Sequence, residues 1–101
     1  MSKYSFTVTD TNKGTVCKDG YCYEDLDTSA VNSTWRAVQW NGTSGVAELC
    51  DGQDFNINTG EQALSSEAEI QALVNAWNTG YDREQQQIAA DAQAQLDAQN
   101  V

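Results

Sequence analysis

One stretch of sequence decides the fold of this chain: Trp35-Arg-Ala-Val-Gln-Trp-Asn-Gly-Thr-Ser-Gly-Val-Ala-Glu-Leu49. It places an Asn-Gly pair between two short runs of aromatic and aliphatic residues, and both residues of that pair tolerate the positive φ angles of a tight turn. The sequence therefore predicts a β-hairpin over residues 35–49.

The length of the loop sets the register of this hairpin. A loop of four residues (41–44) places Val38 opposite Ala47 and Arg36 opposite Leu49, which gathers the apolar side chains on one face. A loop of five residues would instead place Val38 opposite a glutamate. We therefore expect the four-residue loop.

The two tryptophans of the first strand should then lie on opposite faces, because side chains alternate along a strand. We expect Trp40 in the core beside Val38, with Leu49 packing from the partner strand. Trp35 would be an interface or ligand-stacking residue, or would be partly buried under residues 24–33.

Upstream of this hairpin, two further segments have strand patterns. Residues 4–9 alternate strictly and direct Phe6 and Val8 to one face, which predicts a half-buried strand. Residues 16–23 contain Asp19-Gly20, which predicts a second hairpin with a two-residue turn.

The polar segments 24–33 and 51–60 show no clear period, and we expect them to be loops. Both contain acidic side chains. Residues 51–60 and the turn at residues 10–14 have oxygen-bearing side chains at a spacing that faintly resembles a calcium-binding loop. Neither has the terminal glutamate of such a loop, so we interpret them as turns. Residues 1–64 should form an antiparallel sheet of four or five strands.

A helix should follow, packing on the sheet over residues 65–80. Ser66 and Glu69 have the spacing of a capping box, which satisfies exposed amides at the start of a helix. The residues that follow at helical spacing form one apolar stripe for the core: Ile70, Leu73, Val74 and Trp77.

Residues 81–101 are rich in alanine and glutamine, and we expect a second helix there, either continuous with the first or separated from it at Gly80. A helix from Ser66 to Asn100 would be about 50 Å long, more than a small sheet can cover. A narrow apolar line runs along it, formed by Tyr81, Ile88, Ala92 and Leu96. We expect this line to pack on copies of the chain or on a partner, with a disordered tail as the alternative.

The three cysteines allow several arrangements. With residues 19–20 as the turn, Cys17 lies directly opposite Cys22, where Cα atoms approach to about 4.5 Å and a disulfide is permitted. Reduced structural thiols are the alternative. Cys50 would be a buried thiol, a reactive surface thiol or a bond to another chain.

Composition narrows the function classes. The 101 residues include 15 acidic and 5 basic ones, giving a net charge of −10, which argues against binding nucleic acid or anionic membranes. The chain has no histidine, and we find no nucleophile–base pair and no metal-ligand set, so we expect no enzyme, cofactor or metal site. It also has no apolar run of about 20 residues and no signal-peptide pattern.

The run Ala37–Leu49 (AVQWNGTSGVAEL) resembles a segment of a group of short proteins from tailed bacteriophages. In that group an Asp-Gly-turned hairpin precedes the segment and an ALVNAW-like helix follows it, as Val16–Tyr23 and Ala72–Trp77 do here. The likeness spans roughly residues 14–80, and it departs from the group at the three cysteines and at a missing proline before the helix. The group occurs in tail and tail-fibre regions of phage genomes.

We therefore expect an α+β domain that is a non-enzymatic structural part of a phage virion, in the tail, baseplate or tail fibre, made in the host cytoplasm. Its partners would be other virion proteins and copies of itself, for which a trimer is one arrangement. The alternatives are a tail-fibre assembly chaperone that does not stay in the virion, and a capsid decoration protein.

Overall fold

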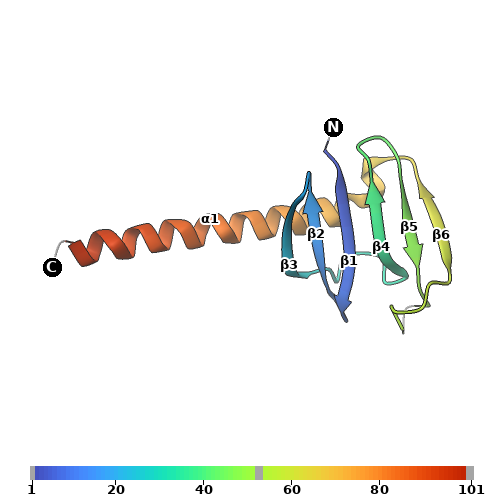
Figure 1. The fold of residues 1–101 in the computed structure, drawn as a ribbon, viewed down its shortest axis with the longest axis horizontal. Coiled ribbons are helices and arrows are strands. Elements are labelled where there is room, and N and C mark those ends of the chain that lie inside the picture. The colour runs from blue at the N-terminus through green and yellow to red at the C-terminus, as the bar shows by residue number, and fades with distance from the viewer. Residues whose placement is uncertain (1, 52–53, 100–101) are drawn as a thin grey trace.

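The computed structural model describes residues 2–51 and 54–99, which form an antiparallel sheet and a long C-terminal helix (Figure 1). The strands are β1 (Tyr4–Asp10), β2 (Lys13–Lys18), β3 (Tyr21–Asp27), β4 (Trp35–Trp40), β5 (Gly45–Leu49) and β6 (Gly60–Leu64). A 3-10 helix, η1 (Glu67–Ile70), leads into α1 (Gln71–Gln99). The α+β class is confirmed, but the sheet has six strands rather than four or five.

The sheet consists of two three-stranded meanders that lie side by side. The strand order is β3-β2-β1-β4-β5-β6, and every neighbouring pair is antiparallel. Strands β1 and β4 join the meanders at the centre of the sheet, so β3 and β6 are its two edges (Figure 1).

Both predicted hairpins form with the expected turns. In the β2–β3 hairpin, Asp19 and Gly20 have φ angles of 51° and 87°, as a tight hairpin turn of this kind requires. In the β4–β5 hairpin, Val38 pairs with Ala47, which confirms the four-residue loop.

The predicted pairing of Arg36 with Leu49 is wrong, because β4 contains a β-bulge. Ala37 pairs with Glu48 and the next pair is Trp35 with Leu49, so Arg36 is the extra residue. A bulge reverses the alternation of side chains beyond it. Trp35 therefore points into the core with only 7% of its surface exposed, rather than to the opposite face from Trp40.

Two strands extend into segments that we expected to be loops. Strand β3 continues through residues 24–27, with a bulge in its pairing to β2 and a positive φ of 54° at Asp25. The sixth strand, β6, pairs along the whole of β5 and begins at Gly60, the last residue of the predicted loop 51–60.

The core lies between one face of the sheet and the first part of α1. The largest side chains that are fully buried there are Phe6, Leu26, Leu64, Ile70, Leu73, Val16 and Val38. Trp40 and Trp77 are also buried, and Val8, Leu49 and Val74 are partly buried against the same cluster.

The helix starts at the predicted cap and then runs without a break. The Ser66 side chain accepts a hydrogen bond from the Ala68 amide, and the Glu69 carboxylate accepts one from the Ser66 amide, so the capping box is confirmed. Helix α1 continues through Gly80 to Gln99; the predicted end at Asn100 lies outside the described residues. No helix in the described part of the chain is long and apolar enough to cross a membrane.

Candidate functional site

Beyond the edge of the sheet, α1 projects as an extension that the body of the protein does not cover. Helix α1 packs on β1, β2 and β3, and its later turns pass the β3 edge and leave the sheet (Figure 1). The whole molecule is 60 Å long as a result. We call the part of α1 from residue 81 onward the extension; its first turns still contact β3, where Glu84 accepts a hydrogen bond from Tyr21, and its later turns are exposed.

The extension carries all four residues that the sequence predicted for association, and we call them the association line: Tyr81, Ile88, Ala92 and Leu96. Tyr81 is 44% exposed, Ile88 is 54% exposed and Leu96 is 53% exposed, and Ala92 is exposed as well. Large apolar side chains that are half exposed on one helix face mark a surface that can gain free energy by being covered.

The spacing of the association line sets its direction on the helix. Tyr81 and Ala92 are eleven residues apart, and so are Trp77 and Ile88. Eleven residues span about three turns, so Tyr81 and Ala92 lie almost on one line parallel to the helix axis. Ile88, Ala92 and Leu96 are four residues apart, so the line turns by about 40° at each of these steps. A partner helix must therefore cross the end of the extension at an angle to follow the line as far as Leu96.

The remainder of the extension is polar and internally bonded. The Gln87 amide donates to the Asp91 carboxylate at 3.0 Å, and the Gln93 amide donates to Asp97 at 3.1 Å. Pairs with this i,i+4 spacing contribute about 0.2–0.5 kcal/mol each to an isolated helix. They support the helix where the sheet gives no support.

At the root of the extension lies an aromatic cluster of Tyr21, Tyr23, Trp77 and Tyr81. The Tyr23 and Trp77 ring centroids are 5.3 Å apart, and the Trp77 and Tyr81 rings are stacked at 5.5 Å. The Trp77 indole N–H donates to the Tyr21 carbonyl at 2.9 Å, which ties α1 to the β3 edge. The Lys18 ammonium lies 4.9 Å from the centre of the Trp77 ring, a cation–π contact.

Acidic and phenolic groups meet beside this cluster. The Tyr21 hydroxyl donates to a Glu84 carboxylate oxygen at 2.8 Å, and this hydrogen bond raises the pKa of Tyr21. Burial raises the pKa of Tyr23, and Glu84 raises it further. The Tyr23 hydroxyl is buried and has no hydrogen-bond partner among the residues that the structure describes. An open cavity of about 420 Å³ adjoins the cluster, with Lys18 and Asp19 at its border.

Gly80 allows the helix to approach β3 closely. A Cβ atom at this position would lie 2.8 Å from Cγ of Tyr23 and 2.9 Å from Cδ2 of Leu26, closer than real Cβ atoms come. Gly80 therefore does not end the helix. It permits the contact that holds the root of the extension against the edge strand.

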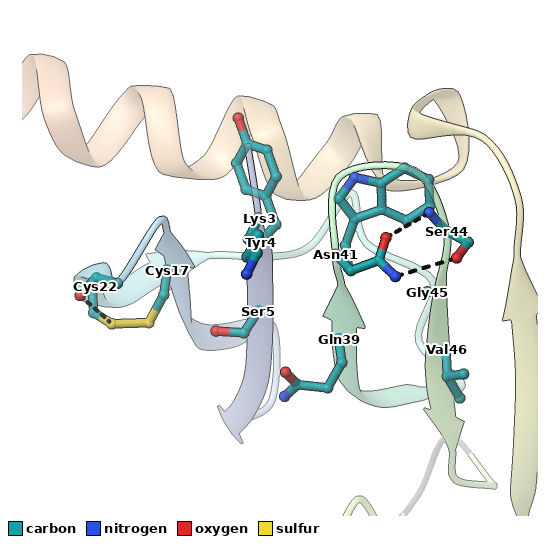
Figure 2. A pocket seen from close by; sticks show the side chains of 12 residues that line it. Lys3, Tyr4, Ser5, Cys17, Cys22, Gln39, Asn41, Ser44, Gly45 and Val46 are labelled. Carbon is teal, nitrogen blue, oxygen red and sulfur yellow. Dashed lines mark hydrogen bonds between the residues drawn. A yellow bond between two sulfur atoms is a disulfide. The ribbon is translucent and has the colours of Figure 1, made fainter. Parts of the chain in front are cut away.

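A second, larger hollow lies beside the disulfide on the sheet. Cys17 and Cys22 are bonded across the β2–β3 hairpin with their Cα atoms 4.0 Å apart, and Figure 2 shows Ser5 and Gln39 on the neighbouring strands. The hollow has a volume of about 640 Å³, and Lys3 is the one charged side chain among its lining residues. These residues include no carboxylate.

Cys50 is a buried thiol, the first of the three arrangements expected for it. Only 4% of its surface is exposed, and its Sγ lies 3.6 Å from the Ser33 carbonyl, to which it donates. Its amide donates to the Thr34 carbonyl. These contacts place Cys50 in the packing between the end of β5 and the segment before β4.

The oxygen-rich segments are hydrogen-bonded turns. The Asp54 amide donates to the Asp51 carboxylate, and the Asn56 amide donates to the Asp54 carboxylate. The predicted turn over residues 10–14 is shorter than expected: Asp10 ends β1 and Lys13 begins β2, and the Asp10 carboxylate accepts a hydrogen bond from the Thr11 amide between them. Within residues 2–51 and 54–99, no cluster of three or more cysteine or acidic side chains could hold a metal ion.

No family model, no curated protein and no solved structure matches the chain.

Proposed function

We propose that this chain is a non-enzymatic structural part of a bacteriophage virion, in the tail, baseplate or tail fibre, that assembles through its helical extension. The sheet would be the folded body, and the association line would bind copies of the chain or another virion protein. The observation that carries the assembly role is the half-exposed apolar line on a helix that leaves its own domain. The virion setting rests on the resemblance of residues 14–80 to phage tail-region proteins.

The energetics favour a covered extension. Full burial of a leucine or isoleucine side chain contributes about 1.5–3 kcal/mol, so covering the exposed halves of Ile88 and Leu96 would contribute about 0.8–1.5 kcal/mol each. A short polar helix without tertiary contacts is marginal in water. A partner along the line would therefore stabilise the extension and the assembly together.

The double substitution Ile88→Asp and Leu96→Asp tests this proposal. We expect it to abolish association, with copies of the chain or with another virion protein, in sedimentation velocity runs of the chain alone and of the chain mixed with dissociated tail proteins, because each aspartate would place a charge inside the covered interface. Circular dichroism and tryptophan fluorescence should show that the sheet remains folded. Ala90→Asp with Ala94→Asp is the matched control, since these exposed positions lie on the opposite side of the helix.

Unchanged association in the Ile88/Leu96 variant would contradict the proposal, as would equal loss in both variants. Sedimentation of the native chain also reports the stoichiometry, including whether the assembly is a trimer.

The protein composition of purified phage particles distinguishes this proposal from its two alternatives, an assembly chaperone and a capsid decoration protein. A structural part stays in tails at a fixed copy number, a decoration protein stays with tail-free capsids, and an assembly chaperone is absent from both. Quantitative mass spectrometry of separated heads and tails measures all three outcomes.

A further inference from the structure

The association line has an acidic border. Glu84 lies one helical turn before Ile88, Asp91 lies three residues after it, and Asp82 follows Tyr81 directly. At about 100° per residue, Glu84 and Asp91 flank one side of the line and Asp82 flanks the other. A partner that covers the line must therefore face carboxylates on both sides.

The one basic side chain of α1 offsets only part of this charge. Arg83 lies five residues before Ile88, about 140° around the helix axis from it. It lines a hollow together with Glu84, Ile88 and Glu24. One cation therefore stands beside three carboxylates along the association line.

A second copy of the chain fits this border poorly. Two parallel extensions would align Asp91 with Asp91, and an antiparallel pair centred on Ile88 would bring Glu84 beside Asp91 of the second copy. Like charges at such positions oppose helix pairing. The net charge of −10 on each chain adds to the repulsion between copies.

The aromatic cluster, by contrast, suits a cation. It already holds the Lys18 ammonium 4.9 Å from the Trp77 ring centre. Tyr21 and Tyr81 expose about half of their surfaces beside it, and Glu84, which accepts a hydrogen bond from Tyr21, lines the same cavity. Aromatic faces with a nearby carboxylate attract ammonium and guanidinium groups.

We infer that the association line and the aromatic cluster together bind a basic amphipathic helix of another protein. Its aliphatic side chains cover Ile88, Ala92 and Leu96, and its lysine or arginine side chains bind Glu84, Asp91 and the exposed tyrosine rings. This inference rests on the proposed function, because it names the chemistry of the partner for the same surface.

A set of three synthetic helical peptides tests the charge of the partner. The peptides have equal length and identical leucine positions, and their remaining positions are all lysine, all glutamine or all glutamate. We titrate each into the full ¹⁵N-labelled chain and follow the amides of the association line and the Trp77 indole N–H. The lysine peptide should bind at least tenfold more tightly than the glutamine peptide, and the glutamate peptide should bind least. The preference should weaken between 50 and 200 mM salt, because screening acts on these exposed charges.

Two variants with equal net charge locate the effect. Glu84→Gln with Asp91→Asn removes the border charges, and Asp97→Asn with Glu67→Gln removes two carboxylates away from the line. The first pair should reduce affinity for the lysine peptide about tenfold, and the second should change it less than twofold. Equal effects of both pairs would show attraction to net charge alone and would overturn the inference.

The outcomes separate this inference from the proposed function. If no peptide is preferred but the chain self-associates and Ile88→Asp with Leu96→Asp abolishes that association, the occupant is a second copy; the inference fails and the assembly role stands. If the chain binds neither itself nor any peptide, both fail.

Discussion

Replacing Gly80 by alanine tests whether close contact with β3 holds the root of the extension. Alanine is more favourable than glycine inside a helix by about 1 kcal/mol, which alone would stabilise α1. The new Cβ would, however, lie 2.8 Å from Cγ of Tyr23 and 2.9 Å from Cδ2 of Leu26. Overpacking of this kind costs about 1–3 kcal/mol. These contacts are with an aromatic ring carbon and a fully buried leucine, so we place the cost at the upper end.

The net expectation is a loss of about 1–2 kcal/mol in the free energy of unfolding. In a domain of this size that corresponds to a fall in Tm of about 4–16 °C. Urea and thermal unfolding, followed by circular dichroism and by tryptophan fluorescence, measure both quantities. The same substitution in an isolated peptide of residues 71–99 is the control, because there the helix has no sheet to contact and helix content should rise. A full chain that is stabilised by the substitution would refute the close-contact argument.

Two further predictions follow from the hairpin edge. Burial and Glu84 raise the pKa of Tyr23, and Glu84 raises that of Tyr21, so the folded state favours the neutral phenols. Their contribution to the free energy of unfolding should be fully present below the ordinary tyrosine pKa of 10.0 and should fall as the pH rises above it. Urea midpoints at pH 9, 10 and 11 should show this fall, and Tyr23→Phe should make it shallower. Cys17→Ser with Cys22→Ser should lower stability by about 2 kcal/mol through loop entropy, and a reductant added to the native chain should give the same loss in urea unfolding; no change in either would contradict the estimate.

Local patterns predicted most of the sheet, because turn chemistry and alternation act over a few residues. Asp19-Gly20 and the 41–44 loop set two registers that the structure confirms. The bulge at Arg36 was not predictable in this way. It is held by contacts to distant residues: the Arg36 guanidinium donates to Glu48 at 2.7 Å and to the Phe55 carbonyl at 2.8 Å.

The edge strands show a similar limit. Strand β6 contains Gly, Glu, Gln, Ala and Leu, which have little intrinsic preference for strands, and its conformation comes from pairing with β5. The acidic end of β3 is extended because β2 pairs with it, even though Asp25 has a positive φ. Tertiary pairing therefore outweighed local propensity at both edges.

At the candidate site, the sequence predicted the association line but not the aromatic cluster. Trp77 and Tyr81 have the i,i+4 spacing of stacked rings on one helix face, and Tyr21 and Tyr23 have the i,i+2 spacing of one strand face. These two spacings were the available signal. That the two pairs meet depends on how α1 crosses the sheet, which local patterns do not determine.

Because α1 runs through Gly80 without a break, its packing on the sheet also fixes the direction in which the side chains of the extension point. The packing of Leu73 and Trp77 in the core fixes the rotation of α1 about its own axis. This rotation then determines the direction in which each side chain of the extension points. Inserting two residues after Tyr81 would lengthen the extension by only about 3 Å yet swing Ile88 and Leu96 through about 200°. Insertions or deletions that change the length of the extension therefore keep the direction of the association line only when they add or remove whole helical turns.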